Sequence, residues 1–243
     1  MNNTVFITGA SSDIGIALIK EIASPDLTII AHYNNSIEKI DKLKNQISGN
    51  IIPLKADLSN DAELKMLIST LTDKYSEISK IVHLASPKIE LLTFKQSKWP
   101  EFEKIYSVQI KSIVLILQAL IPFMIKMKYG KIVFMLSSNT IGLPANGYSA
   151  YTSVKYSLLG LMKSLAVEYG SHNLNFNAVS PSMLDNDFNK NLPGSIKEKL
   201  RLSSPLKRFA STEDIVPVIK FLLSQESNFL NGVNIPACAG SVM

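Results

Sequence analysis

The sequence predicts an α/β fold in which one doubly wound parallel sheet carries helices on both faces. Short apolar runs of strand length alternate with segments whose apolar residues recur at helical spacing, an order typical of right-handed parallel crossovers. The chain has 243 residues, of which 46% are hydrophobic. This length and composition fit one large domain over residues 1–243, with no repeat, linker or low-complexity segment to divide it.

The expected elements follow one another in regular order. We expect strands at Val5–Thr8, Leu27–Ile30, Ile51–Leu54, Ile81–Leu84, Ile132–Leu136, Asn175–Val179 and Val233–Ile235. We expect helices at Ile14–Ile22, Ile37–Ile47, Ala62–Lys74, Trp99–Met127, from about Ser149 onward, and from about Glu213 to Ser224. Pro122 is expected to bend the longest of these helices. The stretch Leu184–Ser204 is expected to be an irregular, mobile lid over a substrate.

Composition and charge exclude several classes of function. The net charge is +5 with a pI near 9.1, and lysines scattered over the expected helices carry almost all of it, which indicates a solvated surface and no nucleic-acid partner. The single cysteine, Cys238, rules out an intramolecular disulfide, and His32, His83 and His172 lack metal-ligand spacing. The apolar run Ile113–Met127 is too short to span a membrane. With no leader before the first strand, we expect a cytoplasmic protein without a metal.

A tyrosine and a lysine on the helix that begins near Ser149 give the strongest chemical signal. Tyr151 and Lys155 are four residues apart, so their side chains lie on one helix face and address the same small volume. The ammonium is expected to lower the pKa of the phenol, which makes Tyr151 a general acid or base. Ser138 follows the apolar run Lys131–Leu136, which places its hydroxyl at the carboxyl end of a strand. Such a tyrosine–lysine pair also arises often by chance.

The turn after the first expected strand gives a second signal. It reads Thr-Gly-Ala-Ser-Ser-Asp-Ile-Gly, with glycines at positions 9 and 15. In a doubly wound sheet, Gly9 makes the tight turn that lets the backbone approach a pyrophosphate at a helix N-terminus, and Gly15 permits close packing of helix on sheet. Ser11 and Ser12 offer hydroxyls and amides to phosphate. Two glycines in one turn are weak evidence by themselves.

Together, the strand–turn–helix opening, Asp57 after the third strand, and the spacing of Ser138, Tyr151 and Lys155 make the chain resemble the short-chain dehydrogenase/reductase family over nearly its whole length. Size and layout are most similar to its ketoacyl-reductase-like members. The resemblance implies a Rossmann-type fold and an oxidoreductase that moves hydride between a nicotinamide and a ketone or the matching alcohol. A 3-oxoacyl thioester, a sugar-derived ketone or another small ketone is then the substrate.

The resemblance also implies residue roles. Tyr151 would protonate the carbonyl oxygen during reduction, Ser138 would hydrogen-bond that oxygen with Ser137 as the weaker candidate, and Lys155 would hold the nicotinamide ribose. Gln109 stands where the family has an asparagine for a water-mediated proton relay. Asp57 is either the family's adenine-contacting aspartate or an ordinary helix N-cap. The cofactor contacts implied, besides Tyr151 and Lys155, are Gly9, Ser11, Ser12, Asp13, Ile14, Gly15, Tyr33, Asn34, Asn35, Ser36, Asp57, Leu58, Ala85, Pro181 and Leu184.

Three departures from the family pattern bear on activity. Asp13 replaces a glycine of the first turn; its carboxylate suits a helix cap and would repel a nearby phosphate unless it points away. The run His83–Ser86 replaces an Asn-Asn-Ala-Gly motif, and Gln109 replaces the relay asparagine. For Gln109 the alternative is a polar residue that satisfies a helix kink. These departures motivate a rival class, a catalytically silent cofactor-binding protein used in regulation or assembly, whereas the intact serine, tyrosine and lysine favour the enzyme.

Cofactor choice and partners come from three further segments. The second expected strand ends without a carboxylate before Glu38, which favours NADP(H) over NAD(H), and no lysine or arginine stands at the usual anchoring positions. The basic turn of Lys126, Lys128 and Lys131 fits either a solvated helix end or a docking site for an acidic acyl carrier protein. The apolar surface of the long helices, together with the resemblance, implies a homotetramer or a dimer.

Overall fold

The computed structural model describes residues 3–88, 90–144, 146–184 and 194–241. Seven parallel strands form one sheet in the order β3-β2-β1-β4-β5-β6-β7, which confirms the predicted α/β fold. The strands are β1 Asn3–Thr8, β2 Leu27–Tyr33, β3 Asn50–Lys55, β4 Ile78–His83, β5 Gly130–Met135, β6 Leu174–Pro181 and β7 Asn234–Ala237. The α-helices are α1 Asp13–Ile22, α2 Ile37–Lys44, α3 Asp61–Lys74, α4 Trp99–Tyr106, α5 Ser112–Met127, α6 Ser149–Tyr169, α7 Gly194–Ser203 and α8 Thr212–Leu223.

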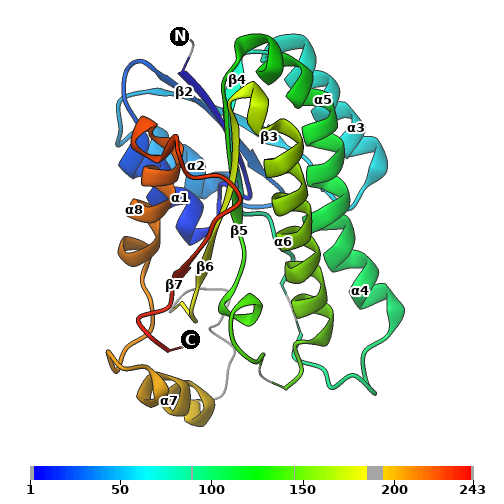
Figure 1. Ribbon diagram of the computed structural model, residues 1–243, viewed down its shortest axis with the longest axis vertical. Helices are drawn as coiled ribbons and strands as arrows, with labels where there is room; N and C mark the ends of the chain where they lie inside the picture. The colour runs from blue at the N-terminus through cyan, green and yellow to red at the C-terminus, as the bar shows by residue number, and fades with distance from the viewer. Residues whose placement is uncertain (1–2, 89, 145, 185–193, 242–243) are drawn as a thin grey trace.

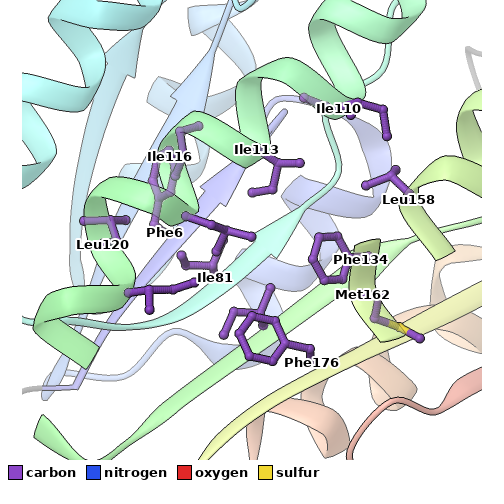
Figure 2. Packing of buried hydrophobic residues seen from close by; sticks show 14 of the residues in the cluster. Phe6, Ile81, Ile110, Ile113, Ile116, Leu120, Phe134, Leu158, Met162 and Phe176 are labelled. Atoms are coloured by element: carbon purple, nitrogen blue, oxygen red, sulfur yellow. The ribbon is translucent and has the colours of Figure 1, made fainter. Parts of the chain in front are cut away.

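Helices cover both faces of the sheet, with α3, α5 and α6 on one side and α1, α2 and α8 on the other (Figure 1). Successive strand residues point to opposite faces, so Phe6 joins one core cluster while its neighbours Val5 and Ile7 join the other. Figure 2 shows aromatic side chains of the strands, among them Phe134 and Phe176, packed beneath the helices of the first side. Two buried faces explain why the strands read as continuous apolar runs.

The long helix differs from its prediction in where it is irregular. One turn of π-helix, η1 (Ser107–Lys111), joins α4 to α5, whereas α5 continues as α-helix through Pro122. The continuous helix Trp99–Met127 is long and apolar enough to cross a membrane by length and composition, but half of its most apolar window is buried in the protein, as in a core helix. A π-turn inside a helix frequently marks a functional site.

The expected lid is only partly irregular. Residues 194–203 of the stretch form α7, which lies beyond the carboxyl ends of the strands (Figure 1), and residues 185–193 lie outside the described residues. Lysine, glutamate, leucine and arginine, which make up most of this segment, are strong helix formers. The prediction missed α7 because the preceding Pro193-Gly194 pair indicates a turn and can equally begin a helix.

Candidate active site

The candidate site lies at the carboxyl edge of the sheet, where the strand order reverses between β1 and β4. In doubly wound sheets this reversal opens the crevice in which ligands bind. The turn after β1, the segment after β4, the serines after β5 and the end of β6 all meet this edge. They carry most of the residues that the sequence singles out. The described residues contain no cluster of three or more potential metal ligands.

Tyr151 and Lys155 lie on the first turns of α6, close to the end of β5. The Nζ of Lys155 donates to the main-chain oxygen of Met135 at 2.6 Å and lies 5.3 Å from the centroid of the Tyr151 ring. The Lys155 side chain is only 3% exposed, and this burial lowers its pKa from 10.5 to about 7. The Tyr148 ring packs edge-on against Tyr151 at 6.0 Å, at the N-cap of the helix.

The hydroxyl of Ser137, the neighbour of Ser138, is hydrogen bonded to the Tyr151 phenol. Ser137 follows the last buried residue after β5 and caps the short 3₁₀ helix η2 (Ser138–Thr140). Burial raises the pKa of Tyr151 to about 12, and the Ser137 hydrogen bond opposes this rise only in part. The expectation of a lowered tyrosine pKa is therefore wrong for this structure, because desolvation of the phenolate outweighs the other effects.

The first turn has the shape that a pyrophosphate needs. Gly9 has φ +66, and a Cβ on it would lie 2.9 Å from the backbone of Ala85; a Cβ on Gly15 would lie 2.5 Å from the Ala10 oxygen. Neither position accepts a side chain. The Ser12 hydroxyl accepts from the Gly15 amide at 3.1 Å and caps α1. The turn thus brings bare backbone and a helix N-terminus to the sheet edge, which fits an anionic dinucleotide.

Asp13 is the first residue of α1, and the cap is Ser12, so the expectation that Asp13 caps the helix is not met. The Asp13 Oδ1 lies 3.1 Å from the Nζ of Lys39 on α2. Both side chains are part-exposed, so the ion pair adds little stability, but it places a positive charge beside the carboxylate. The structure therefore offsets the repulsion of phosphate that the sequence suggests.

Two buried histidines hold the loops at this edge. The Nε2 of His32 donates to the Ala56 oxygen at 3.0 Å, and its Nδ1 accepts from the Gly9 amide at 3.1 Å. The Nε2 of His83 donates to the main-chain oxygen of Gln109 at 3.0 Å, and its Nδ1 accepts from the Thr8 hydroxyl at 2.8 Å. Carbonyl oxygens only accept, so both rings carry their proton on Nε2.

Gln109 occupies the centre of the π-turn and is fully buried. Its Nε2 donates to the Ser86 hydroxyl at 3.0 Å, while its main-chain oxygen accepts from His83. Its Oε1 is buried without a hydrogen-bond partner among the described residues. The carboxamide is thus half satisfied, in a helix turn beside α6.

The other expected cofactor contacts are distributed along the same edge. Asp57 holds its own turn by accepting from the Ser59 amide and hydroxyl at 2.8 and 2.6 Å, and Asn60 caps α3, so Asp57 is not an N-cap. These hydrogen bonds lower the Asp57 pKa. Leu58 and Ala85 are buried, Pro181 ends β6, Leu184 bridges to Ala210, and Tyr33, Asn34, Asn35 and Ser36 connect β2 to α2.

The basic turn after α5 is smaller than expected. Lys126 and Lys128 are exposed, but Lys131 is fully buried in β5, where its Nζ donates to the Ser227 hydroxyl at 3.0 Å. Lys131 lies among apolar residues in a strand that is buried on both faces. A docking surface at this turn can therefore include only the first two lysines.

Sequence reasoning missed the partners that complete the site. Ser137 ranked below its neighbour, and Lys39 was not considered. His32 entered only in excluding a metal site, and His83 entered there and as a departure from the family motif. The available signal was their position: a histidine inside a continuous apolar strand must find hydrogen-bond partners.

This fold and this arrangement of tyrosine, lysine and serine define a short-chain dehydrogenase/reductase. The model of the family described as "Enoyl-(Acyl carrier protein) reductase" matches residues 9–241, and the chain belongs to this family. The chain is thus an NAD(P)-dependent oxidoreductase, and the silent-protein alternative is not favoured.

Named relatives and solved structures agree with this placement. The 3-oxoacyl-[acyl-carrier-protein] reductase FabG of Thermotoga maritima is 29% identical over 241 residues, 98% of this chain and 96% of the relative. Its namesake from Staphylococcus aureus is 25% identical and covers 100% of this chain and 99% of the relative. A short-chain dehydrogenase/reductase from Mycobacterium ulcerans has TM-score 0.89 at 19% identity over 99% of this chain and 90% of its own. YwfH, an NADPH-dependent reductase involved in bacilysin biosynthesis, has TM-score 0.88 at 18% identity over 100% and 99%.

Proposed function

We propose that this single-domain chain reduces the ketone of a 3-oxoacyl thioester with NADPH as hydride donor. The observation that carries the proposal is the hydrogen-bonded pair of hydroxyls, Tyr151 and Ser137, above the buried Lys155 ammonium. Two hydroxyls that converge on one point suit a carbonyl oxygen, which gains negative charge during reduction. The names of the relatives supply the thioester and its acyl carrier protein.

Each residue of this group has a separate role. Tyr151 gives its proton to the carbonyl oxygen; with its pKa raised by burial to about 12, the phenol carries that proton at neutral pH. The Ser137 hydroxyl hydrogen-bonds the same oxygen as charge develops. Lys155, whose pKa of about 7 leaves it partly charged at neutral pH, lies beside the ring and would donate hydrogen bonds to the ribose. When bound, the reduced nicotinamide supplies the hydride that goes to the carbonyl carbon.

Lys39 supports a preference for NADPH over NADH. No carboxylate stands at the end of β2 to reject a 2′-phosphate, and the Lys39 ammonium lies between α2 and the glycine turn, 3.1 Å from Asp13. A phosphate bound there would share that ammonium with the carboxylate. The amides and hydroxyl of Asn34, Asn35 and Ser36 complete the proposed contact.

Calorimetric titration of the cofactors tests this preference. Lys39→Ala is expected to raise the NADPH dissociation constant about tenfold and to leave that of NADH unchanged, since it removes one charge-assisted contact. Lys42→Ala is the matched control, because Lys42 is an exposed lysine on the same helix. Equal weakening of both cofactors by Lys39→Ala would contradict the preference.

Exposed charged and apolar side chains indicate the macromolecular partners. The exposed lysines Lys126 and Lys128 offer a small positive patch for an acidic acyl carrier protein. Exposed apolar side chains on the helices of one face, including Tyr106, Leu115 and Tyr156, favour a homotetramer or dimer built through these helices. Sedimentation of the purified protein measures that state directly. We place the reaction in the cytoplasm, where single buried cysteines such as Cys238 are ordinary.

Steady-state assays decide between the ketone and an enoyl substrate, which the family description also names. NADPH oxidation is expected with a 3-oxoacyl thioester and not with the matching 2-enoyl thioester, because only in the ketone does the carbon that accepts the hydride bear the oxygen that both hydroxyls bind. Tyr151→Phe controls for turnover that does not use the site. Activity with the enoyl thioester alone would overturn the proposal.

A further inference from the structure

The main-chain carbonyl of Gln109 is already engaged inside the protein. It accepts from the Nε2 of His83 at 3.0 Å, and His83 is in turn fixed by Thr8, whose hydroxyl also accepts from the Ala85 amide at 3.2 Å. This chain of hydrogen bonds ties the π-turn to β1 and β4. His83 is 2% exposed and pairs with Phe134 in the sheet, one residue before the Met135 whose main-chain oxygen accepts from Lys155, so the tie lies beside the proposed catalytic group.

The side chain of Gln109, in contrast to its main-chain carbonyl, is only partly hydrogen bonded. Its Nε2 is held by the Ser86 hydroxyl at 3.0 Å, which orients the carboxamide at the end of β4, one residue beyond the Ala85 that packs against Gly9. Its Oε1 is fully buried and has no hydrogen-bond partner among the described residues. A buried acceptor without a donor costs free energy, and a partner that arrives with a ligand recovers it.

We propose that His83 is a positioning residue. By donating to the main-chain oxygen of Gln109, it leaves the Gln109 carboxamide oxygen as the acceptor for an O–H donor bound beside Lys155. The donor is a hydroxyl of the cofactor ribose or a water that arrives with it. This inference rests on the proposed function. The hydrogen bond from the bound donor is thereby assigned to the Gln109 side chain, whose position is fixed by the π-turn.

Gln109→Met tests the acceptor, because methionine keeps the length and removes the carboxamide. The free variant is expected to unfold at the same or a higher temperature than the parent protein, since the unsatisfied oxygen is gone, while kcat falls at least tenfold. A merely structural glutamine predicts lower stability with unchanged kcat. If the donor is a ribose hydroxyl, the NADPH dissociation constant measured by calorimetry rises at least fivefold; if it is a water, that constant is unchanged while kcat still falls. Unchanged kcat and unchanged affinity together would overturn the inference.

A double-mutant cycle tests His83. If His83 acts through Gln109, His83→Phe lowers kcat to the level of Gln109→Met, and the double variant is no slower than either single one. His83→Gln keeps a side-chain N–H donor and is expected to recover most of the lost rate. His32 is the matched control, because it is equally buried and makes the same two kinds of bond one loop away. His32→Phe is expected to combine additively with Gln109→Met.

The outcomes separate this inference from the proposed function. No turnover of a 3-oxoacyl thioester by the parent protein would refute the proposed function. An active parent protein whose His83 and Gln109 effects add independently would refute only the positioning role. If His83→Phe does not fold, the cycle is run with His83→Gln and His83→Asn, whose donors differ in reach; equal rates in these two variants would also refute it.

Discussion

Lowering the pH from 7 to 5 is expected to destabilise this protein by about 4 kcal/mol through its two buried histidines. His32 and His83 are each 2% exposed, and burial lowers their pKa values from 6.5 to about 4 and about 3. In the unfolded chain both rings take a proton as the pH falls through 6.5. In the folded protein they stay neutral until the pH reaches the lowered values, so the unfolded state binds more protons and gains stability relative to the fold.

The magnitude follows from these pKa differences. Each ring costs the fold about 1.4 kcal/mol for each pH unit below 6.5, which is about 2 kcal/mol per histidine at pH 5. The contribution is complete above pH 6.5; the loss ends near pH 4 for His32 and near pH 3 for His83. Asp57 and Asp214, whose pKa values are lowered from 3.8 by hydrogen bonds, change charge below pH 5, outside the interval from pH 7 to pH 5.

Urea unfolding at pH 7 and pH 5, at one protein concentration, measures the loss. In His32→Asn and His83→Asn the fold is weaker at pH 7, but the difference between the two pH values shrinks to about 2 kcal/mol because one titrating ring is gone. A loss below about 1 kcal/mol in the parent protein, or an equal loss in all three proteins, would refute the assignment of neutral, structurally fixed rings.

Three substitutions at the site have distinct expected outcomes. Tyr151→Phe should lower kcat about 10³-fold with little change in NADPH affinity, as measured by steady-state kinetics and calorimetry, since only the proton donor is lost. Ser137→Ala should lower kcat about 10²-fold and Ser138→Ala less than about threefold, and the reverse order would contradict the serine assignment. Gly9→Ala should abolish NADPH binding and lower the melting temperature because its φ is +66 and its Cβ has no room, whereas Gly160→Ala, with nothing within 4 Å, should not.

The strands and most helices are predictable from the sequence because apolar runs and periodically spaced apolar residues determine them. Apolar runs predict the strands, and spacing of three and four predicts α1, α3 and the start of α6. The π-turn Ser107–Lys111 was out of reach, because its residues continue the helical pattern and it differs only in main-chain hydrogen bonding, with the Ser112 amide donating to the Ser107 oxygen. The helix α7 was missed because a proline–glycine pair is ambiguous between a turn and a helix start.

The site was predictable where two residues share one rigid element. Tyr151 and Lys155 are fixed relative to each other by the helix, so their spacing alone brings them together. Ser137 and Ser138 lie across a loop from Tyr151, and residue spacing along a loop does not distinguish neighbouring serines. The direction of the tyrosine pKa shift also escaped prediction, because burial is a property of the whole fold.

The departures from the family pattern are matched by changes elsewhere, with one exception that points to function. Asp13 has Lys39 as its counter-charge, and His83 satisfies both ring nitrogens through Thr8 and the π-turn. In a catalytically silent protein nothing would retain a buried carboxamide oxygen without a hydrogen bond, because an apolar residue of the same shape removes that free-energy cost. The Oε1 of Gln109 is buried without a hydrogen-bond partner among the described residues. Strain of this kind persists where the missing partner belongs to the reaction, which favours a working site over an inherited scaffold.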